Sequence, residues 1–255
     1  MIPVPDYPKG TNLLRDKVVV VTAAAGTGIG SAVAKRSLDE GAHVVLSDWH
    51  ERRLREKAEE LGDVHAIPCD VTDEDQVQAL IDGARAEFGR IDVLVNNAGL
   101  GGSKSIVDMS DDEWNRVLDV TLNGTFRATR AAVRAFIAQG GGGAIVNNAS
   151  VVGWRAQAEQ AHYAAAKAGV MALTRCAAVD VAQYGIRVNA VAPSLAMHPF
   201  LAKVTTEELL AELTAREVSG RAAEPWEVAN VMVFLASDYA SYLTGEVISV
   251  SSQHA

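Results

Sequence analysis

The sequence predicts a doubly wound α/β fold, in which a seven-stranded parallel sheet carries helices on both faces. Two observations lead to this fold class. Short runs of β-branched residues recur along the chain, and longer, Ala-rich, charge-bearing segments with helical periodicity alternate with them. The runs are hydrophobic almost without interruption, which is typical of strands that are covered on both faces. Ligands of such folds are expected beyond the carboxyl ends of the strands.

Seven strands and six longer helices are expected along the chain. The strands are KVVVVT (17–22), HVVLSD (43–48), VHAIPCD (64–70), IDVLVNN (91–97), AIVNNAS (144–150), IRVNAVAP (186–193) and EVISVSS (246–252). The helices lie at about 28–40, 51–61, 73–88, 111–138, 160–184 and 225–236.

Residues with known end preferences mark several helix termini. Asp73 and Asp111 are expected N-caps, because a short acceptor side chain can bind the free N–H groups of a first turn. Glycine favours the left-handed conformation in which many helices end. Four glycines stand at such positions: Gly41, Gly62, Gly89 and Gly185.

We expect one domain over residues 1–255, because no Pro- or Ser-rich linker divides the chain. Residues 1–16 form an N-terminal extension ahead of the first strand. The least regular stretch, 194–220, lies between strands six and seven and contains a short amphipathic helix. It is interpreted as a substrate lid, since long insertions in compact domains are often functional. The alternative is a surface helical hairpin without a role.

Composition narrows the classes of partner. The chain has 23 basic and 32 acidic residues and a formal net charge of −9. Such a surface repels nucleic acid and anionic membranes, so a small-molecule substrate is expected instead. Cys69 and Cys176 lack the spacing of a disulfide framework or a metal site, and no metal is expected. The first ten residues contain three prolines and no apolar run, which favours a cytoplasmic protein over a secreted or membrane-spanning one.

A glycine-rich loop follows the first strand. In TAAAGTGIG (22–30) the spacing is Gly26-Thr27-Gly28-Ile29-Gly30, and a helix begins there. Glycines allow the backbone to approach a pyrophosphate, whose charge is stabilised by the N–H groups of the helix N-terminus. The loop therefore predicts a Rossmann-like dinucleotide site. By itself, a purely structural strand-to-helix turn would explain the glycines as well.

Asp48 ends the second strand, twenty residues after Gly28. A carboxylate at this position can accept hydrogen bonds from a ribose 2′-hydroxyl and would repel a 2′-phosphate. NAD is therefore the expected cofactor, with NADP less favoured. Arg52 and Arg53 follow closely, either as a solvated helix face or as a phosphate-binding pair.

Tyr163 and Lys167 are four residues apart in the helical segment HYAAAKAG. Their side chains are therefore expected on one helix face. A free tyrosine has a pKa of about 10, and a nearby ammonium can lower the pKa of an acid by roughly 1 to 3 units. The pair predicts a tyrosine that serves as a general acid or base. Ser150 ends the fifth strand, where a hydroxyl can bind a substrate carbonyl or alkoxide.

Taken together, these residues resemble the short-chain dehydrogenase/reductase family over nearly the whole chain. The motifs occur in the family's order: the glycine loop, Asp48, Cys69-Asp70-Val71, Asn96-Asn97-Ala98-Gly99, Ser150, Tyr163-x-x-x-Lys167 and the Pro193 region. The resemblance implies that Tyr163 is the general acid/base, that Lys167 lowers its pKa and holds the nicotinamide ribose, and that Ser150 positions the substrate. It also implies cofactor contacts from Asp70, Val71, Asn97, Ala98, Gly99 and Pro193.

The sequence departs from the family pattern at several positions. Ala23 and Ala24 stand where the first glycine of a loop one residue shorter would fall, and Thr121 replaces the asparagine of the proton relay. Asn123, two residues further on, would point elsewhere on a helix. After strand six the usual Pro-Gly reads Pro193-Ser194, and His198 replaces a threonine that meets the nicotinamide amide. The terminal Gly-Gly reads Ser251-Ser252.

These departures resemble an actinobacterial subgroup associated with steroid-ring catabolism. The segments that carry this resemblance are TAAAGTGIG, DVTLNGTF, VAPSLA-H, GRAAEPWEVA and SYLTGEVISVSSQ. The implied substrate is a secondary alcohol on an alicyclic or steroid-derived ring fragment, possibly carried as a CoA thioester. Five residues could line its pocket or be ordinary loop packing: Trp154, Arg155, Leu195, Met197 and Phe200.

The leading hypothesis is a dehydrogenase that transfers hydride between NAD and a secondary alcohol or ketone. Two alternatives remain open. One is a non-catalytic dinucleotide-binding sensor or scaffold, and the other is an isomerase or lyase that uses bound nicotinamide. The long Ala-rich helices at 111–138 and 160–184 could pack across a two-fold axis, and the family resemblance implies a homodimer or homotetramer.

Overall fold

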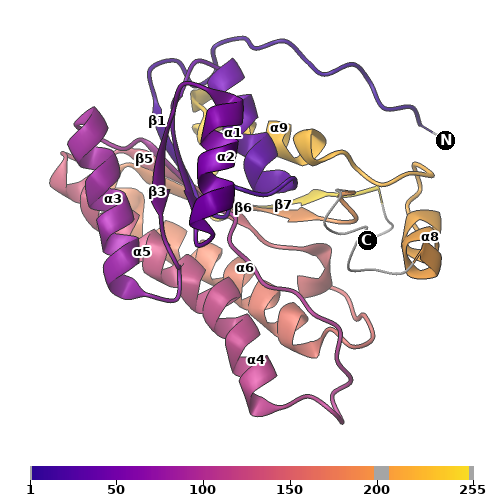
Figure 1. The fold of residues 1–255 in the computed structure, drawn as a ribbon. Coiled ribbons are helices and arrows are strands. Elements are labelled where there is room, and N and C mark those ends of the chain that lie inside the picture. Colours follow the sequence, from indigo (N-terminus) through magenta and orange to yellow (C-terminus); the bar gives the residue numbers. More distant parts are fainter. Residues whose placement is uncertain (1, 198–206, 253–255) are drawn as a thin grey trace.

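The protein forms one twisted parallel sheet between two layers of helices (Figure 1). The computed structural model describes residues 2–197 and 207–252. Its seven strands lie in the order β3-β2-β1-β4-β5-β6-β7, and every neighbouring pair is parallel. The predicted fold class is therefore confirmed.

The strands and helices lie close to their expected positions. The strands are β1 (Val18–Val21), β2 (His43–Asp48), β3 (Val64–Pro68), β4 (Val93–Asn96), β5 (Gly143–Asn148), β6 (Ile186–Pro193) and β7 (Val247–Val250). The α-helices are α1 (Ile29–Asp39), α2 (Glu51–Leu61), α3 (Glu74–Phe88), α4 (Asp111–Leu118), α5 (Gly124–Ala138), α6 (Ala161–Val181), α8 (Glu207–Ala215) and α9 (Pro225–Ala236). The described residues also form four single-turn helices: η1 (Asp119–Asn123), η2 (Val151–Gly153), η3 (Ala182–Tyr184) and η4 (Asp238–Ala240).

Two apolar cores lie on opposite faces of the sheet. Val19 and Val21 of β1 belong to the core under α1, α2 and α9. Val18 and Val20 belong to the core under α3, α5 and α6. Successive side chains of a strand point to opposite faces, so the Val18–Val21 run fills both cores at once.

Two expectations about helix ends and continuity need correction. Asp73 caps α3 as predicted, but α4 is capped by Ser110 rather than Asp111. Ser110 and Glu113 form a reciprocal capping box, which satisfies more of the free backbone groups than Asp111 alone would. The expected continuous helix at 111–138 is interrupted by η1, a π-helical turn.

The structure agrees with the other predicted helix ends. Gly62 and Gly89 are the C-caps of α2 and α3, and both have a positive φ. Gly41 and Gly185 follow α1 and η3, also with positive φ. Within the described ranges, no helix has the length and apolarity to cross a membrane.

Candidate active site

A cavity of about 1510 Å³ opens at the carboxyl ends of the strands. Loops that follow β1, β2, β3, β4, β5 and β6 contribute to its lining, as the topology predicts. The main candidates that the sequence predicted for catalysis and cofactor binding line it: Gly26, Thr27, Gly28, Ile29, Gly30, Asp48, Asp70, Val71, Asn97, Ala98, Gly99, Ser150, Tyr163, Lys167 and Pro193.

The glycine loop leads directly into the N-terminus of α1. Gly28 is the N-cap, and no side chain among the described residues caps this helix or adds a carboxylate to its first turn. The first N–H groups of α1 are therefore available to an anion. A side chain on Gly30 would collide with the Ala23 carbonyl and the Asn97 amide, so only glycine fits there.

The sequence departure at Ala23 has a structural counterpart. Ala23 has a φ of 50°, a conformation that glycine adopts more easily than alanine. The Asn97 side chain holds this turn, because its Nδ2 donates to the main-chain oxygens of Thr22, at 3.2 Å, and Ala23, at 3.0 Å. Asn97 thus supports the loop from β4.

Asp48 links the end of β2 to the glycine loop. The residue is buried, with 8% of its surface exposed. One carboxylate oxygen accepts a hydrogen bond from Ala25 N at 3.2 Å, and the other accepts one from His50 N at 3.0 Å. The carboxylate is therefore fixed in place at the cavity wall.

The two arginines after Asp48 separate in the structure. Arg52 is exposed and pairs with Glu56 at 2.9 Å. This favours the interpretation of Arg52 as part of a solvated helix face. Arg53 lines the cavity, and its buried Nε has no hydrogen-bond partner among the described residues. Trp49, 69% exposed, also lines the cavity beside them.

The floor of the cavity is built from side-chain amides at the ends of β4 and β5. Asn97 donates to two carbonyls, so its Oδ1 must be an acceptor, and Asn148 Nδ2 donates to it at 2.9 Å. Asn148 also presents its main-chain oxygen to Lys167 Nζ at 2.5 Å. One asparagine therefore connects the glycine-loop support to the reacting end of the cavity.

Tyr163 and Lys167 lie on one face of α6, as their spacing predicted. Lys167 Nζ lies 5.5 Å from the centroid of the Tyr163 ring. Ser150 follows β5 and caps η2, accepting a 3.4 Å hydrogen bond from Val152 N. The three side chains line the same cavity as the glycine loop.

Burial dominates the ionisation of this group. It raises the pKa of Tyr163, and a hydrogen bond with Ser150 partly opposes that rise. Burial also lowers the pKa of Lys167 from 10.5 to about 8. For Tyr163, desolvation outweighs the Ser150 hydrogen bond, so its pKa lies above the ordinary value. The expected lowering of that pKa by Lys167 stays a prediction.

Thr121, in the relay position, is fully buried in η1. Its Oγ1 accepts from Leu100 N at 3.0 Å and lies 3.3 Å from the Leu100 oxygen, to which it donates. Asn123 donates from Nδ2 to Asp119 Oδ1 at 3.1 Å, and it lines the cavity, whereas Thr121 does not. Thr121 therefore holds the loop after β4, and its hydroxyl is already paired.

Sequence reasoning missed one wall of the cavity. The π-helical turn and the preceding helix contribute Asn115, Arg116, Leu118, Asp119 and Val120. Asn115, Leu118 and Asp119 show helical spacing, but the sequence contains no signal for where this helix crosses the sheet edge.

Among the described residues, only some of those expected to line a substrate pocket are found at the cavity. Leu195 lines the cavity, whereas Trp154, Arg155 and Met197 are not part of its lining. Trp154 is half exposed, which favours the loop-packing interpretation. Phe200 and His198 lie outside the described residues.

The chain was compared with known proteins. A family model described as Enoyl-(Acyl carrier protein) reductase matches residues 23–252. A reductase from Mycobacterium tuberculosis, named for (5R,7aS)-5-hydroxy-7a-methyl-1-oxo-2,3,5,6,7,7a-hexahydro-1H-indene-carboxyl-CoA, is 66% identical over 96% of this chain and 95% of its own. The cis-4-hydroxycyclohexanecarboxylate dehydrogenase of Sinomonas cyclohexanicum is 44% identical over 92% of this chain and 95% of its own.

The chain is also similar to a solved structure. The crystal structure of a short chain dehydrogenase from Mycobacterium smegmatis has a TM-score of 0.89 and 56% identity, and the match covers 99% of each chain. The family model and these relatives define the class of protein: an oxidoreductase that binds a nicotinamide dinucleotide. The chain belongs to the short-chain dehydrogenase/reductase family. Its predicted resemblance to the steroid-ring catabolism subgroup is also confirmed.

Proposed function

We propose that this protein transfers hydride between NAD and a secondary alcohol or ketone on an alicyclic ring, with Ser150, Tyr163 and Lys167 as its catalytic residues. The observation that carries the proposal is one cavity that joins the uncapped N-terminus of α1 and Asp48 to these three side chains. A dinucleotide is long enough to need such a continuous cavity.

The relatives support the alicyclic substrate. The compounds in the names of both enzymes have a hydroxyl on a saturated or partly saturated ring and a carboxyl group. In the compound of the Mycobacterium tuberculosis enzyme, that carboxyl is linked to CoA. We propose a steroid-derived or other alicyclic ring fragment of this kind, with the CoA-linked form as the leading candidate.

The residues fit a bound nicotinamide dinucleotide. The free N–H groups of α1 suit a pyrophosphate, and the space beside Gly26 is open, since a Cβ built there would meet, among the described residues, only Gly28 N, at 3.9 Å. The fixed carboxylate of Asp48 suits two ribose hydroxyls and opposes a 2′-phosphate. We therefore propose NAD rather than NADP, with Asp70, Val71 and the Asn97–Gly99 turn as further contacts.

The chain's own residues would handle the proton. When bound, the dinucleotide supplies the hydride acceptor, or in its reduced form the donor. In the oxidation direction, the ionised oxygen of Tyr163 takes the proton of the substrate alcohol and becomes a hydroxyl, and in reduction that hydroxyl gives its proton to the carbonyl oxygen. Ser150 donates a hydrogen bond to the same substrate oxygen. Lys167, held by the Asn148 carbonyl, favours the ionised tyrosine whenever its amine is protonated.

The family resemblance and the composition of the chain also bear on its location and its oligomeric state. We propose a cytoplasmic homotetramer or homodimer, assembled through the exposed faces of the Ala-rich helices. Phe126 and Ile137 on α5 and Val179 on α6 are exposed apolar side chains on those helices.

The test is absorbance of the reduced cofactor with NAD⁺ and NADP⁺ separately, against ring alcohols offered both free and as CoA thioesters. Tyr163→Phe is the catalytic control, because it keeps the ring and removes the proton carrier. NADH formation that the variant abolishes supports the proposal. Tight NAD binding without turnover on any substrate would favour a sensor or scaffold instead. Turnover without net change of cofactor absorbance would favour an isomerase or lyase.

A further inference from the structure

Two of the sequence's departures from its family converge on one buried carboxylate. Glu217 is 4% exposed, although it lies in a loop after α8. Its Oε2 accepts hydrogen bonds from Ser194 Oγ at 3.1 Å and Ser252 Oγ at 2.8 Å. Leu195 N donates to Oε1 at 3.4 Å. Ser194 and Ser252 stand where the family pattern has glycine, which has no hydroxyl to donate.

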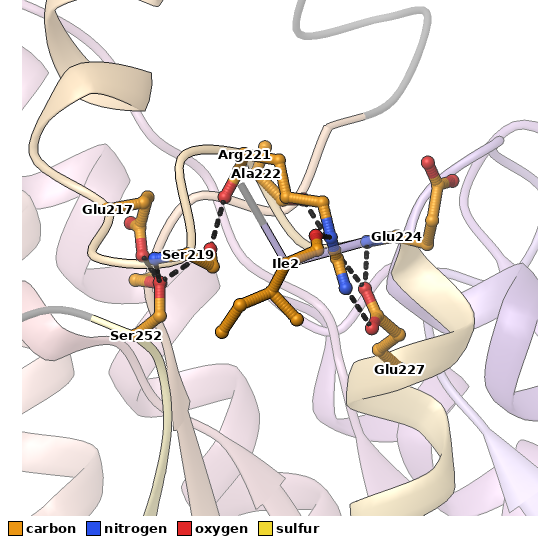
Figure 2. A network of polar contacts seen from close by, with 9 residues as sticks. Ile2, Glu217, Ser219, Arg221, Ala222, Glu224, Glu227 and Ser252 are labelled. Carbon is orange, nitrogen blue, oxygen red and sulfur yellow. Dashed lines mark hydrogen bonds and ion pairs between the residues drawn. The ribbon is translucent and has the colours of Figure 1, made fainter. Parts of the chain in front are cut away.

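The contacts of Glu217 join three segments that are distant in the sequence. Ser194 and Leu195 follow β6 and begin the stretch 194–220, Glu217 lies near the end of that stretch, and Ser252 follows β7. Ser252 binds this stretch a second time, through Ser219 Oγ at 2.9 Å and Val218 N at 3.0 Å. Figure 2 shows Glu217, Ser219 and Ser252 gathered in one group.

The same region is held on its other side by the N-terminal extension. Ile2 N donates to the Ser219 oxygen at 2.9 Å, and Arg221 Nε donates to the Ile2 oxygen at 3.0 Å. Arg221 in turn pairs with Glu227 of α9 at 2.7 Å, as Figure 2 shows. The loop that carries Glu217 is therefore anchored to a fixed part of the fold.

The segment held by Glu217 is a wall of the candidate active site. Ser194, Leu195 and Ala196 all line the cavity. They follow β6, which pairs with β5, the strand that ends just before Ser150. Asp48 ends β2, three strands further across the sheet. The wall Ser194–Ala196 thus stands at the reacting end of the cavity and away from the adenosine end.

We propose that Glu217 is a positioning residue for the substrate. By holding two hydroxyls and one backbone N–H, it fixes the wall Ser194–Ala196 at the distance from Ser150 that a ring substrate requires. A carboxylate suits this role because its hydrogen bonds are short and strong, and because an unpaired buried carboxylate would be costly. The role toward a substrate rests on the proposed function, whereas the fixing of the wall can be measured whether or not that function is correct.

The first experiment compares Glu217→Gln with Glu212→Gln, a matched change on the exposed face of α8, where Glu212 pairs with Arg216. Glu217→Gln is expected to raise KM for the ring substrate about tenfold, the change that corresponds to losing one hydrogen bond to a charged group. The kcat is expected to change less than about twofold. The Kd for ADP-ribose should stay unchanged in both variants, and Glu212→Gln should alter none of these values.

A second pair guards against a folding defect in the Glu217 variant. Ser252→Gly removes one donor and restores the family's residue, while Ser251→Gly changes the adjacent serine, which bonds Ser249 instead. Ser252→Gly should raise KM in the same direction as Glu217→Gln, and Ser251→Gly should not. Equal KM values for all four variants and the parent protein would overturn the substrate role.

Amide hydrogen exchange separates this proposal from the proposed function. Met197 N donates to the Ala223 oxygen and Ala223 N donates to the Leu195 oxygen, at 2.9 and 2.8 Å. Exchange at Met197 and Ala223 should be faster in Glu217→Gln than in Glu212→Gln. Unchanged exchange would refute the fixed wall even if the enzyme turns over the ring substrate. If exchange is faster but no ring substrate is turned over, the role of Glu217 in fixing the wall is supported and only the proposed function is contradicted.

Discussion

At the scale of single residues, the reacting end of the cavity is defined by desolvation. Tyr163 and Lys167 meet as their four-residue spacing predicted, but the sequence contains no signal for how deeply α6 buries them. Burial disfavours the charged form of both groups, which raises the pKa of the tyrosine and lowers that of the lysine. Asn148, which accepts a hydrogen bond from Lys167, was missed because a backbone acceptor leaves no trace in residue type.

Lys167→Met tests this burial. The folded protein holds the lysine proton less tightly than the unfolded chain, since its pKa is about 8 instead of 10.5. Stability of the parent relative to the variant should therefore rise as pH increases from about 8 towards 10.5, and the full cost of the buried cation should be present below that window. Urea unfolding of both proteins at several pH values measures the difference. A stability difference that does not change with pH would contradict the buried-cation account.

Asp48→Asn tests cofactor choice. Asparagine keeps an acceptor for one of the two backbone N–H groups that bind Asp48, and it loses the negative charge that opposes a 2′-phosphate. The ratio of kcat/KM for NADP to that for NAD should rise about tenfold or more, because a hydrogen bond to a charged group contributes roughly 1.5 to 3 kcal/mol.

The matched control for Asp48→Asn is Asp70→Asn. Asp70 lines the cavity but is engaged with Thr72, through the backbone N–H at 2.9 Å and the hydroxyl at 2.8 Å. Its substitution should affect the two cofactors alike and leave the ratio unchanged. An equal rise in both variants would mean that Asp48 acts only through the general charge of the cavity.

At the scale of elements, the strands were predictable and one helix was not. Continuous apolar runs located β2 and β6 to the residue, because strands covered on both faces leave a pattern with few alternatives. The region 111–138 reads as one helix, since an Ala-rich segment gives no sign of a π-helical turn. That turn changes which residues of 119–123 face the cavity and buries Thr121 under the loop after β4.

Thr121→Val tests the structural role of this turn. Valine has nearly the same shape but leaves the N–H and carbonyl of Leu100 without their hydroxyl partner. We expect a loss of about 1 to 3 kcal/mol in unfolding free energy, measured by urea titration. Thr121→Ser keeps the hydroxyl and should lose less. If the serine variant were as unstable as the valine variant, packing of the methyl group rather than the hydrogen bonds would explain the loss.

At the scale of the whole molecule, the alternation of strands and helices was enough to predict the sheet and the edge at which the cavity forms. It was not enough to predict the size of the cavity or the wall from α4, because these depend on the path of loops. The clustering of Ser194, Glu217 and Ser252 was equally out of reach, since residues 23 and 35 positions from Glu217 meet only after the sheet has formed.

Assembly is the prediction that belongs to this scale. Val179 is 79% exposed on α6, and Phe126 is 43% exposed on α5. An interface over these helices would remove both from water. Light scattering should give the mass of a dimer or tetramer, and Val179→Glu should lower it. A parent protein that remains monomeric at every concentration tested would contradict this assembly.

The central claim is hydride transfer between NAD and a ring carbon, and isotope transfer tests it most directly. A ring ketone carboxyl-CoA thioester is incubated with NADH that carries deuterium on the transferring face of its nicotinamide, and the product is analysed by mass spectrometry. We expect a secondary alcohol that carries one deuterium at the carbinol carbon, and none when Tyr163→Phe replaces the parent protein. An alcohol without deuterium, or no alcohol from any ring ketone despite bound NADH, would contradict the account.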